Sequence, residues 1–260
     1  MANYEKDFQT VTEILSKQTI TNIDRMILLS IYQTPYHDTG KIEGFTSCDS
    51  SCNGCTFCQK MRESNKDNKL CICNYCYDNE QEQRWKNVKN RHSLNLLIIS
   101  SVLFEEEELA TLNIGLLNRF NSSGDIENII QARNYIRIAK SHQLTFNTLF
   151  AKNTSPVIEA TDIEGKPENI IYIQSSPIIG KPCKLAKYFD FTFTVYPDEQ
   201  TTLEAIKAGS GECNGKKCKF CKKCYLPEKL GGWKKGTNIA ELLRLKSKKQ
   251  LEEILNEYYQ

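Results

Sequence analysis

Twelve cysteines are the residues of this chain best suited to chemistry, and eleven of them fall in three short groups. The groups are Cys48-x3-Cys52-x2-Cys55-x2-Cys58, then Cys71-x-Cys73-x2-Cys76, then Cys213-x4-Cys218-x2-Cys221-x2-Cys224, and Cys183 stands apart from all three. Two cysteines separated by two residues can direct both thiolates at one metal, as in zinc ribbons and iron–sulfur proteins. The spacing therefore predicts that these cysteines bind metal.

The same spacing bears on which metal is bound. Zinc usually takes its four ligands as two separate pairs, whereas the first and third groups each contain three cysteines at x2-x2 spacing. Three cysteines in a row are typical of ferredoxins with cubane clusters. Iron–sulfur clusters of the 4Fe-4S type are therefore favoured, and zinc stays open as the alternative. Counting ligands gives three sets of four if Cys183 completes the second group.

The composition leaves room for a hydrophobic core and predicts no membrane segment. The chain has 260 residues, 40% of them hydrophobic, with 34 Lys+Arg against 32 Asp+Glu. No apolar run approaches the ~18 residues of a membrane helix. Residues 1–8 show no basic stretch followed by an apolar one, so no secretory signal is expected. We therefore expect a cytoplasmic protein, whose thiols bind metal instead of forming disulfides.

Strands that alternate with helices predict an α/β fold. Strand patterns cover 116–121, 145–150, 170–174 and 191–196, and helical patterns cover 128–142 and 199–208. This alternation predicts a mainly parallel sheet, open or curled into a partial (β/α) barrel. An apolar run within 87–109 fits a buried strand and a buried helix equally well. Functional residues should gather beyond the carboxyl ends of the strands.

We expect three segments along the chain. Residues 1–35 form an N-terminal helical segment, 36–226 a cysteine-rich metal-binding α/β domain, and 227–260 a basic C-terminal helical segment. In the last segment two short helices are predicted. The first is capped by Thr237 or Asn238, and the second begins at the capping box formed by Ser247 and Gln250.

Basic residues are concentrated near the third cysteine group. Residues 213–249 contain twelve Lys/Arg and two Asp/Glu. Five of these lysines lie among the cysteines, namely Lys216, Lys217, Lys219, Lys222 and Lys223. With Phe220, Tyr225 and Trp233 available for stacking, they indicate binding of nucleic acid or of a host nucleoprotein. Alternatively, they offset the negative charge of the thiolates. Nothing in the sequence indicates an oligomeric state.

Other constellations of catalytic residues are missing from the sequence. His37, His92 and His142 are isolated from one another, and no Gly-rich phosphate loop occurs. Nucleotide hydrolysis, Rossmann dinucleotide binding and Cys/His hydrolysis are therefore not predicted. His142 ends a predicted helix, where a cation suits the helix dipole, so we expect a structural role for it.

Several sequence motifs together resemble a known family. In chain order they are Cys73-Asn-Tyr-Cys76-Tyr77, Arg119-Phe-Asn-Ser-Ser-Gly-Asp125, Ile138-Ala-Lys, Phe146-Asn-Thr-Leu-Phe-Ala-Lys-Asn153 and Cys218-Lys-Phe-Cys221-Lys-Lys-Cys224-Tyr225. Over roughly residues 42–226 the chain resembles the "gene product 88" proteins of bacteriophages and mobile elements. The resemblance implies a phage or prophage setting and a metal-bound β/α protein, and little about activity.

A more distant resemblance is to the radical S-adenosylmethionine enzymes. Cys48-x3-Cys52-x2-Cys55 has the spacing of their cysteine signature, although Gly54 replaces the usual aromatic residue. The turn of Ser123, Gly124 and Asp125 resembles the one that receives the methionine amine of the cofactor. The resemblance implies that an open iron chelates S-adenosylmethionine and that Asp125, as a catalytic residue, holds the ammonium.

Overall fold

The computed structural model describes residues 4–32, 45–51, 55–213, 218–244 and 247–260. Among these residues the protein is an α/β fold with one sheet of seven strands, all parallel, which confirms the predicted class. The strands are β1 (Phe45–Cys48), β2 (Leu117–Phe120), β3 (Phe146–Ala151), β4 (Ile170–Ser175), β5 (Phe191–Tyr196), β6 (Gly211–Cys213) and β7 (Asn238–Leu242). Their order in the sheet is β1-β2-β3-β4-β5-β7-β6.

The helices include every helix predicted from the sequence except one. The longer ones are α1 (Tyr4–Leu15), α2 (Asn22–Ile31), α3 (Thr56–Ser64), α4 (Tyr77–Arg84), α5 (Lys86–Ser101), α7 (Ile129–Ser141), α8 (Ser155–Glu164), α9 (Glu199–Lys207) and α11 (Lys248–Tyr258). The short ones are α6 (Glu106–Leu109), α10 (Cys218–Cys221) and the 3-10 helices η1 (Ile72–Tyr75) and η2 (Glu228–Leu230). No helix in the described ranges has both the length and the apolar composition that crossing a membrane requires.

Side chains at the helix starts explain why these segments begin where they do. Asn128, Asp198 and Ser247 each accept a hydrogen bond from a backbone N–H in the first turn of α7, α9 and α11. Such caps replace bonds that the first turn of a helix otherwise lacks. The apolar run of 87–109 resolves as helix α5. Its residues Leu94 and Ile98 recur at the helical period and are buried in the main core, where α5 packs against α1 and α7.

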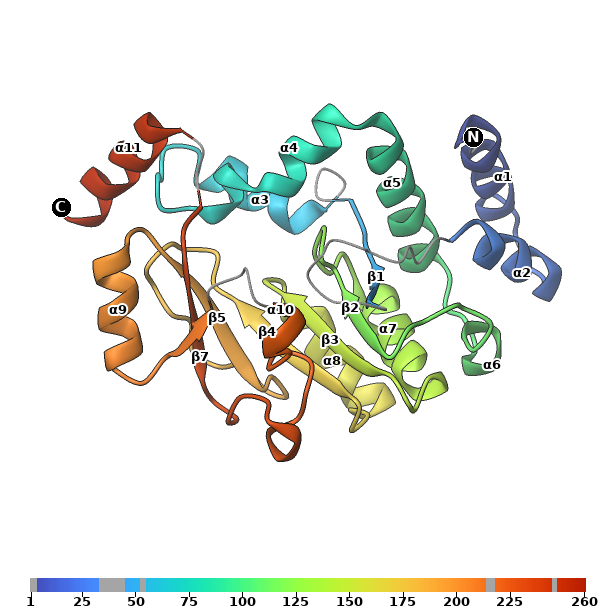
Figure 1. Ribbon diagram of the computed structural model, residues 1–260. Helices are drawn as coiled ribbons and strands as arrows, with labels where there is room; N and C mark the ends of the chain where they lie inside the picture. Colours follow the sequence, from blue (N-terminus) through green and yellow to red (C-terminus); the bar gives the residue numbers. More distant parts are fainter. Residues whose placement is uncertain (1–3, 33–44, 52–54, 214–217, 245–246) are drawn as a thin grey trace.

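Strands β1 to β5 lie side by side in chain order, so each strand is added on the same side of the one before it. Right-handed crossovers between neighbouring parallel strands then place the connecting helices on the same face. Figure 1 shows α7 and α8 behind the sheet and α10 in front of it. The helix face is buried in the main core, where Phe120 and Tyr172 of the sheet pack with Ile136 of α7 and Val157 of α8. The opposite face of the sheet is covered by residues that follow β6, among them Tyr225 and Trp233.

The predicted helix at Thr237 or Asn238 is wrong, because the structure has strand β7 there. Asn238 lies opposite Thr192, and its side-chain oxygen accepts hydrogen bonds from Thr192 Oγ1 at 2.9 Å and Thr194 Oγ1 at 2.8 Å. Ile239 and Ala240 are fully buried on opposite faces of the sheet. β7 lies between β5 and β6. Residues 227–260 therefore supply a central strand as well as helix α11.

A row of buried polar side chains crosses the first three strands at one register position. Thr46, Asn118 and Asn147 are neighbours in the sheet and are fully buried on the helix face. Thr46 Oγ1 donates to Asn118 Oδ1 at 3.1 Å, and Asn118 Nδ2 donates to Asn147 Oδ1 at 2.9 Å. Buried polar groups need such partners, and slipping one strand by a residue would separate them. The row therefore fixes the register of β1, β2 and β3.

Replacing the middle member tests this account. Asn118→Leu removes the acceptor of the Thr46 hydroxyl and the donor to the Asn147 side-chain oxygen. We expect it to lower the free energy of unfolding by about 2 kcal/mol. The measurement is denaturant unfolding followed by circular dichroism. Asn256→Leu, at an exposed position of α11, is the control and should change it by less than about 0.5 kcal/mol. Equal effects of the two variants would contradict the role of the row.

Candidate metal centres

The third cysteine group covers the face of the sheet that the helices leave open. Tyr225 packs on Leu117 and Phe146, near the start of β2 and β3. Cys224 and Trp233 pack on a second apolar patch of the same face, formed by Phe150, Ile171, Ile173, Phe191, Phe193 and Ile239. Thr148 Oγ1 of β3 donates a hydrogen bond to the Cys224 carbonyl at 2.8 Å. Residues 224–233 are thus anchored across the sheet.

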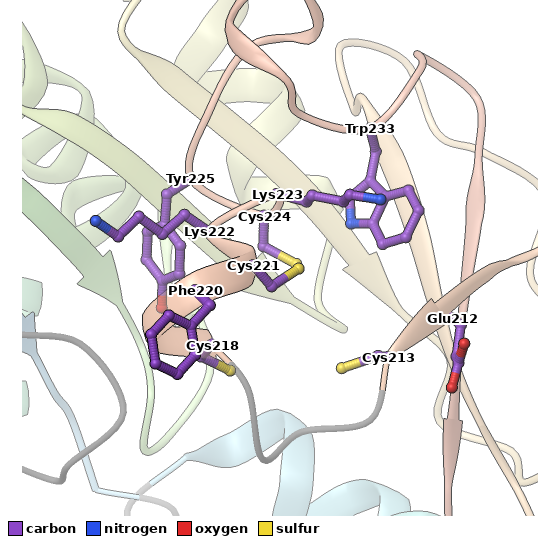
Figure 2. Close-up of a pocket in the computed structure, with 10 residues that line it drawn as sticks. All are labelled: Glu212, Cys213, Cys218, Phe220, Cys221, Lys222, Lys223, Cys224, Tyr225 and Trp233. Carbon is purple, nitrogen blue, oxygen red and sulfur yellow. The ribbon is translucent and has the colours of Figure 1, made fainter.

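The four cysteines of this group line one cavity of about 300 Å³. Figure 2 shows the sulfur atoms of Cys213 and Cys218 pointing toward one another, and those of Cys221 and Cys224 directed into the same space. The structure thus brings together the same four cysteines that lie close in the sequence. Burial, with the nearby Cys213, raises the pKa of the Cys224 thiol to about 12, although Trp233 opposes the shift. Metal binding would have to release that proton.

The side chains expected to bind nucleic acid are only partly available. Lys222 and Lys223 are exposed, and the Lys223 ammonium lies 4.4 Å from the centre of the Trp233 ring. Tyr225 is 8% exposed, whereas Phe220 is 83% exposed. Of the three aromatic side chains, Phe220 alone stands out from the surface as a stacking platform would. Lys216, Lys217 and the side chain of Lys219 lie outside the described residues.

The first two cysteine groups are brought together into one cluster of thiols. Its buried members are Cys55, Cys58, Cys71 and Cys73, and Cys76 packs against them. The thiols form a chain of hydrogen bonds. Cys58 is hydrogen-bonded to Cys55 and to Cys73, and Cys73 is hydrogen-bonded to Cys71. Hydrogen bonds to its sulfur from the Cys73 thiol and from backbone amides lower the pKa of Cys71 to about 6, against the effect of burial. We call these five residues the thiol cluster.

Backbone contacts hold the thiol cluster over the carboxyl ends of the strands. The Glu127 carboxylate accepts hydrogen bonds from the backbone N–H of Thr56, at 2.8 Å, and from its hydroxyl, at the start of α3. Ile72 donates to the Pro177 carbonyl at 2.9 Å, and Ile179 donates to the Leu70 carbonyl at 2.8 Å. The loops that follow β2 and β4 therefore position both halves of the cluster.

The remaining described cysteines lie elsewhere. Cys48 is fully buried in the core of the helix face, and its thiol donates to Asn118 Oδ1 at 3.7 Å. Burial raises the pKa of Cys48 to about 12, although a hydrogen bond with Tyr32 opposes the shift. The Cys183 thiol donates to the Gln174 carbonyl at 3.9 Å. Neither residue packs in the thiol cluster with which the count had grouped it. Cys52 lies outside the described residues.

The turn of Ser123, Gly124 and Asp125 is docked on the loop that follows β1. Asp49 Oδ1 accepts from the Ser123 N–H at 3.0 Å, and the Ser123 carbonyl accepts from the Ser50 N–H at 3.1 Å. Gly124 has φ +85°, and a Cβ there would lie 2.6 Å from the Ser50 carbonyl oxygen. Glycine is therefore required both by the backbone angle and by the close approach of the two loops.

Asp125 uses its carboxylate to hold the loop after β3. It accepts hydrogen bonds from the backbone N–H groups of Ile126 at 2.8 Å, Lys152 at 3.0 Å and Asn153 at 3.4 Å. Burial raises the pKa of Asp125 to about 6, against the opposing charge of Lys152. Three amides already surround these oxygens, so the carboxylate does not fit the amine of S-adenosylmethionine, and we derive no step through that cofactor.

A buried network around His92 was not anticipated from the sequence. His92 Nδ1 lies 3.0 Å from Glu82 Oε1, and His92 Nε2 lies 4.0 Å from Asp49 Oδ2. Glu82 also accepts from the Ser51 hydroxyl at 3.1 Å. The network ties α4 and α5 to the loop that follows Cys48. His142 is the C-cap residue of α7, as its place in the sequence predicts, and its Nε2 lies 3.0 Å from the Leu112 carbonyl.

Two further findings complete the description of these centres. Within the described residues, no group of three or more Cys, His, Asp or Glu side chains is arranged to hold a metal ion. Searches against family models, curated proteins and solved structures find no match to this chain. The functional argument therefore depends on the chemistry and geometry of the residues themselves.

The docking of the two loops gives a testable prediction. Gly124→Ala combines strain at positive φ with a collision against the Ser50 backbone, whereas Gly165→Ala, at φ +75°, meets nothing within 4 Å. We expect about 1–3 kcal/mol of destabilisation from strain at Gly165, whose ψ is 156°, and a clearly larger loss at Gly124. Denaturant unfolding of both variants measures the difference. Equal losses would show that the close approach of the loops contributes nothing to stability.

Proposed function

We propose that this protein binds iron–sulfur clusters through its cysteines. The observation that carries the proposal is the cavity lined by Cys213, Cys218, Cys221 and Cys224. Its volume of about 300 Å³ belongs to the whole cavity, which Phe220 and Trp233 also line. A structural zinc site would draw all four sulfurs to ~2.3 Å from one ion. A multi-iron cluster is larger and would bridge the four thiolates without closing this space.

The state of the cysteines supports the same proposal. The eleven described cysteines form no disulfide, and nine of them lie in the cavity group or the thiol cluster. Thiols crowded in this way repel one another once they are deprotonated, so they need a cationic centre between them. The thiol cluster has few apolar neighbours, chiefly Phe57, Met61 and Ile72. A metal centre would supply the cohesion that a hydrophobic core supplies elsewhere.

The proposal includes a biological setting but names no chemical reaction for the protein. The resemblance to the "gene product 88" proteins adds a phage or mobile-element origin, with the protein in the host cytoplasm. S-adenosylmethionine chemistry is not part of the proposal, because the contacts of Asp125 are already made within the protein.

Anaerobic purification followed by iron, sulfide and zinc analysis tests the proposal. We expect a brown protein with several irons and sulfides per chain and with absorption in the blue–violet. Cys224→Ala should lose part of this iron, because it removes a ligand from the cavity group. Cys183→Ala, outside both groups, is the matched control and should keep the full iron content. A colourless protein that holds zinc alone would overturn the proposal.

A zinc-stabilised module that binds nucleic acid or a host nucleoprotein is the second candidate. It is favoured by Lys222 and Lys223, which are exposed beside the protruding Phe220. On this function, Lys222→Glu with Lys223→Glu should abolish salt-dependent binding of single-stranded nucleic acid, since the affinity comes from phosphate contacts. Filter binding at several salt concentrations measures the effect, with Lys207→Glu on α9 as the control. Binding that survives the double change would contradict this candidate.

A further inference from the structure

The cavity of the third cysteine group contains a buried hydrogen-bond donor. Trp233 lines this cavity together with the four cysteines, and its indole Nε1 is buried. Within the part of the chain that the structure describes, no acceptor forms a hydrogen bond with this N–H. Burying a donor without a partner lowers stability, so such groups are few in folded proteins. The indole N–H is therefore available to a group bound in the cavity.

The packing of Trp233 fixes the direction of this donor. The indole ring lies against the backbone of β6, where a Cβ at Gly211 would lie 2.5 Å from ring atom Cζ3 and 2.8 Å from Cε3. The Lys223 ammonium lies 4.4 Å from the centre of the same ring. The ring also packs on the apolar patch that contains Ile173 and Phe191. Turning the ring over would disturb all of these contacts, so the N–H keeps one direction.

Sulfur atoms lie on the side of the cavity that the donor faces. Figure 2 shows the indole nitrogen on the edge of the ring toward the cavity, into which Cys221 and Cys224 also direct their sulfur atoms. Cys213 and Cys224 pack on the same apolar patch as Trp233. Thiolates that bind metal carry negative charge, and a hydrogen bond to a charged acceptor is stronger than one to a neutral acceptor.

We propose that the Trp233 indole N–H donates a hydrogen bond to a sulfur atom of an iron–sulfur cluster held by the four cavity cysteines, and thereby raises its reduction potential. The inference rests on the proposed function and deepens it by naming a residue that tunes the bound centre. Adding an electron makes a thiolate-bound cluster more negative, so a donor to sulfur stabilises the reduced form more than the oxidised form. Trp233 donates to sulfur and is not a ligand to iron.

Redox titration of the full chain tests the effect on the potential. Trp233→Phe removes the N–H but keeps an aromatic ring on the apolar patch, and we expect one reduction step to move to lower potential. Trp85→Phe is the matched control, because Trp85 is 63% exposed and does not line the cavity, and it should shift no step. Unchanged potentials in a Trp233→Phe protein that keeps its full iron content would overturn the inference.

The indole signals in a proton–nitrogen correlation spectrum test the placement of Trp233 independently. The chain has two tryptophans, so two indole N–H signals are expected, and Trp85→Phe assigns them. In the reduced, cluster-loaded protein, the unpaired electrons of iron should broaden or shift the Trp233 signal and leave the Trp85 signal in place. A Trp233 signal that stays unaltered in iron-loaded protein would show that the iron lies elsewhere, which also overturns the inference.

Failure of the inference and failure of the proposed function give different results. Absence of iron and sulfide from the unchanged protein would overturn the proposed function, and the inference with it. Iron and sulfide in the unchanged protein, with potentials and indole signals that do not respond, would overturn the role of Trp233 alone.

Discussion

The direction in which the sheet is wound determines where the other parts of this protein can lie. Because β1 to β5 are added in chain order, the crossover helices gather on one face and leave the other without a helical cover. That open face is apolar, with Phe150 and Ile173 among its residues, and it must be shielded from water. The third cysteine group provides the shield, so its thiols act as small apolar groups and as candidate ligands at once.

The elements of the sheet were predictable where their patterns are long. β4 appears in the sequence as an apolar run and β5 as aromatic residues alternating with threonine, and α7, α9 and α11 have capping residues at their starts. β1 reads Phe-Thr-Ser-Cys and β6 reads Gly-Glu-Cys, so neither short strand has an apolar run that would mark it. β7 was mistaken for a helix because Ile239 and Leu242 also fit a helical period. Its two-sided burial depends on strands far away in the sequence.

For the candidate centres, spacing identified the residues but could not assign their partners. Counting ligands treats each group as a unit, whereas the fold decides which loops meet, and it joined Cys58 to Cys73 through the loops after β2 and β4. The count also included Cys48, which the strand carries into the aliphatic core instead. No local pattern marks the pairing of Glu82 with His92, because it arises from the packing of α4 on α5.

The position of β7 between β5 and β6 has a consequence for how the sheet is closed. Parallel neighbours need a long crossover, usually a helix, and here the crossover from β6 to β7 is residues 214–237, which contain three of the four cavity cysteines. β6 itself ends at the fourth, Cys213. On the proposed function, metal takes the place of a crossover helix in holding an edge strand. Loss of the metal would then free the edge of β7 to pair with other chains, so the metal would protect this protein against aggregation.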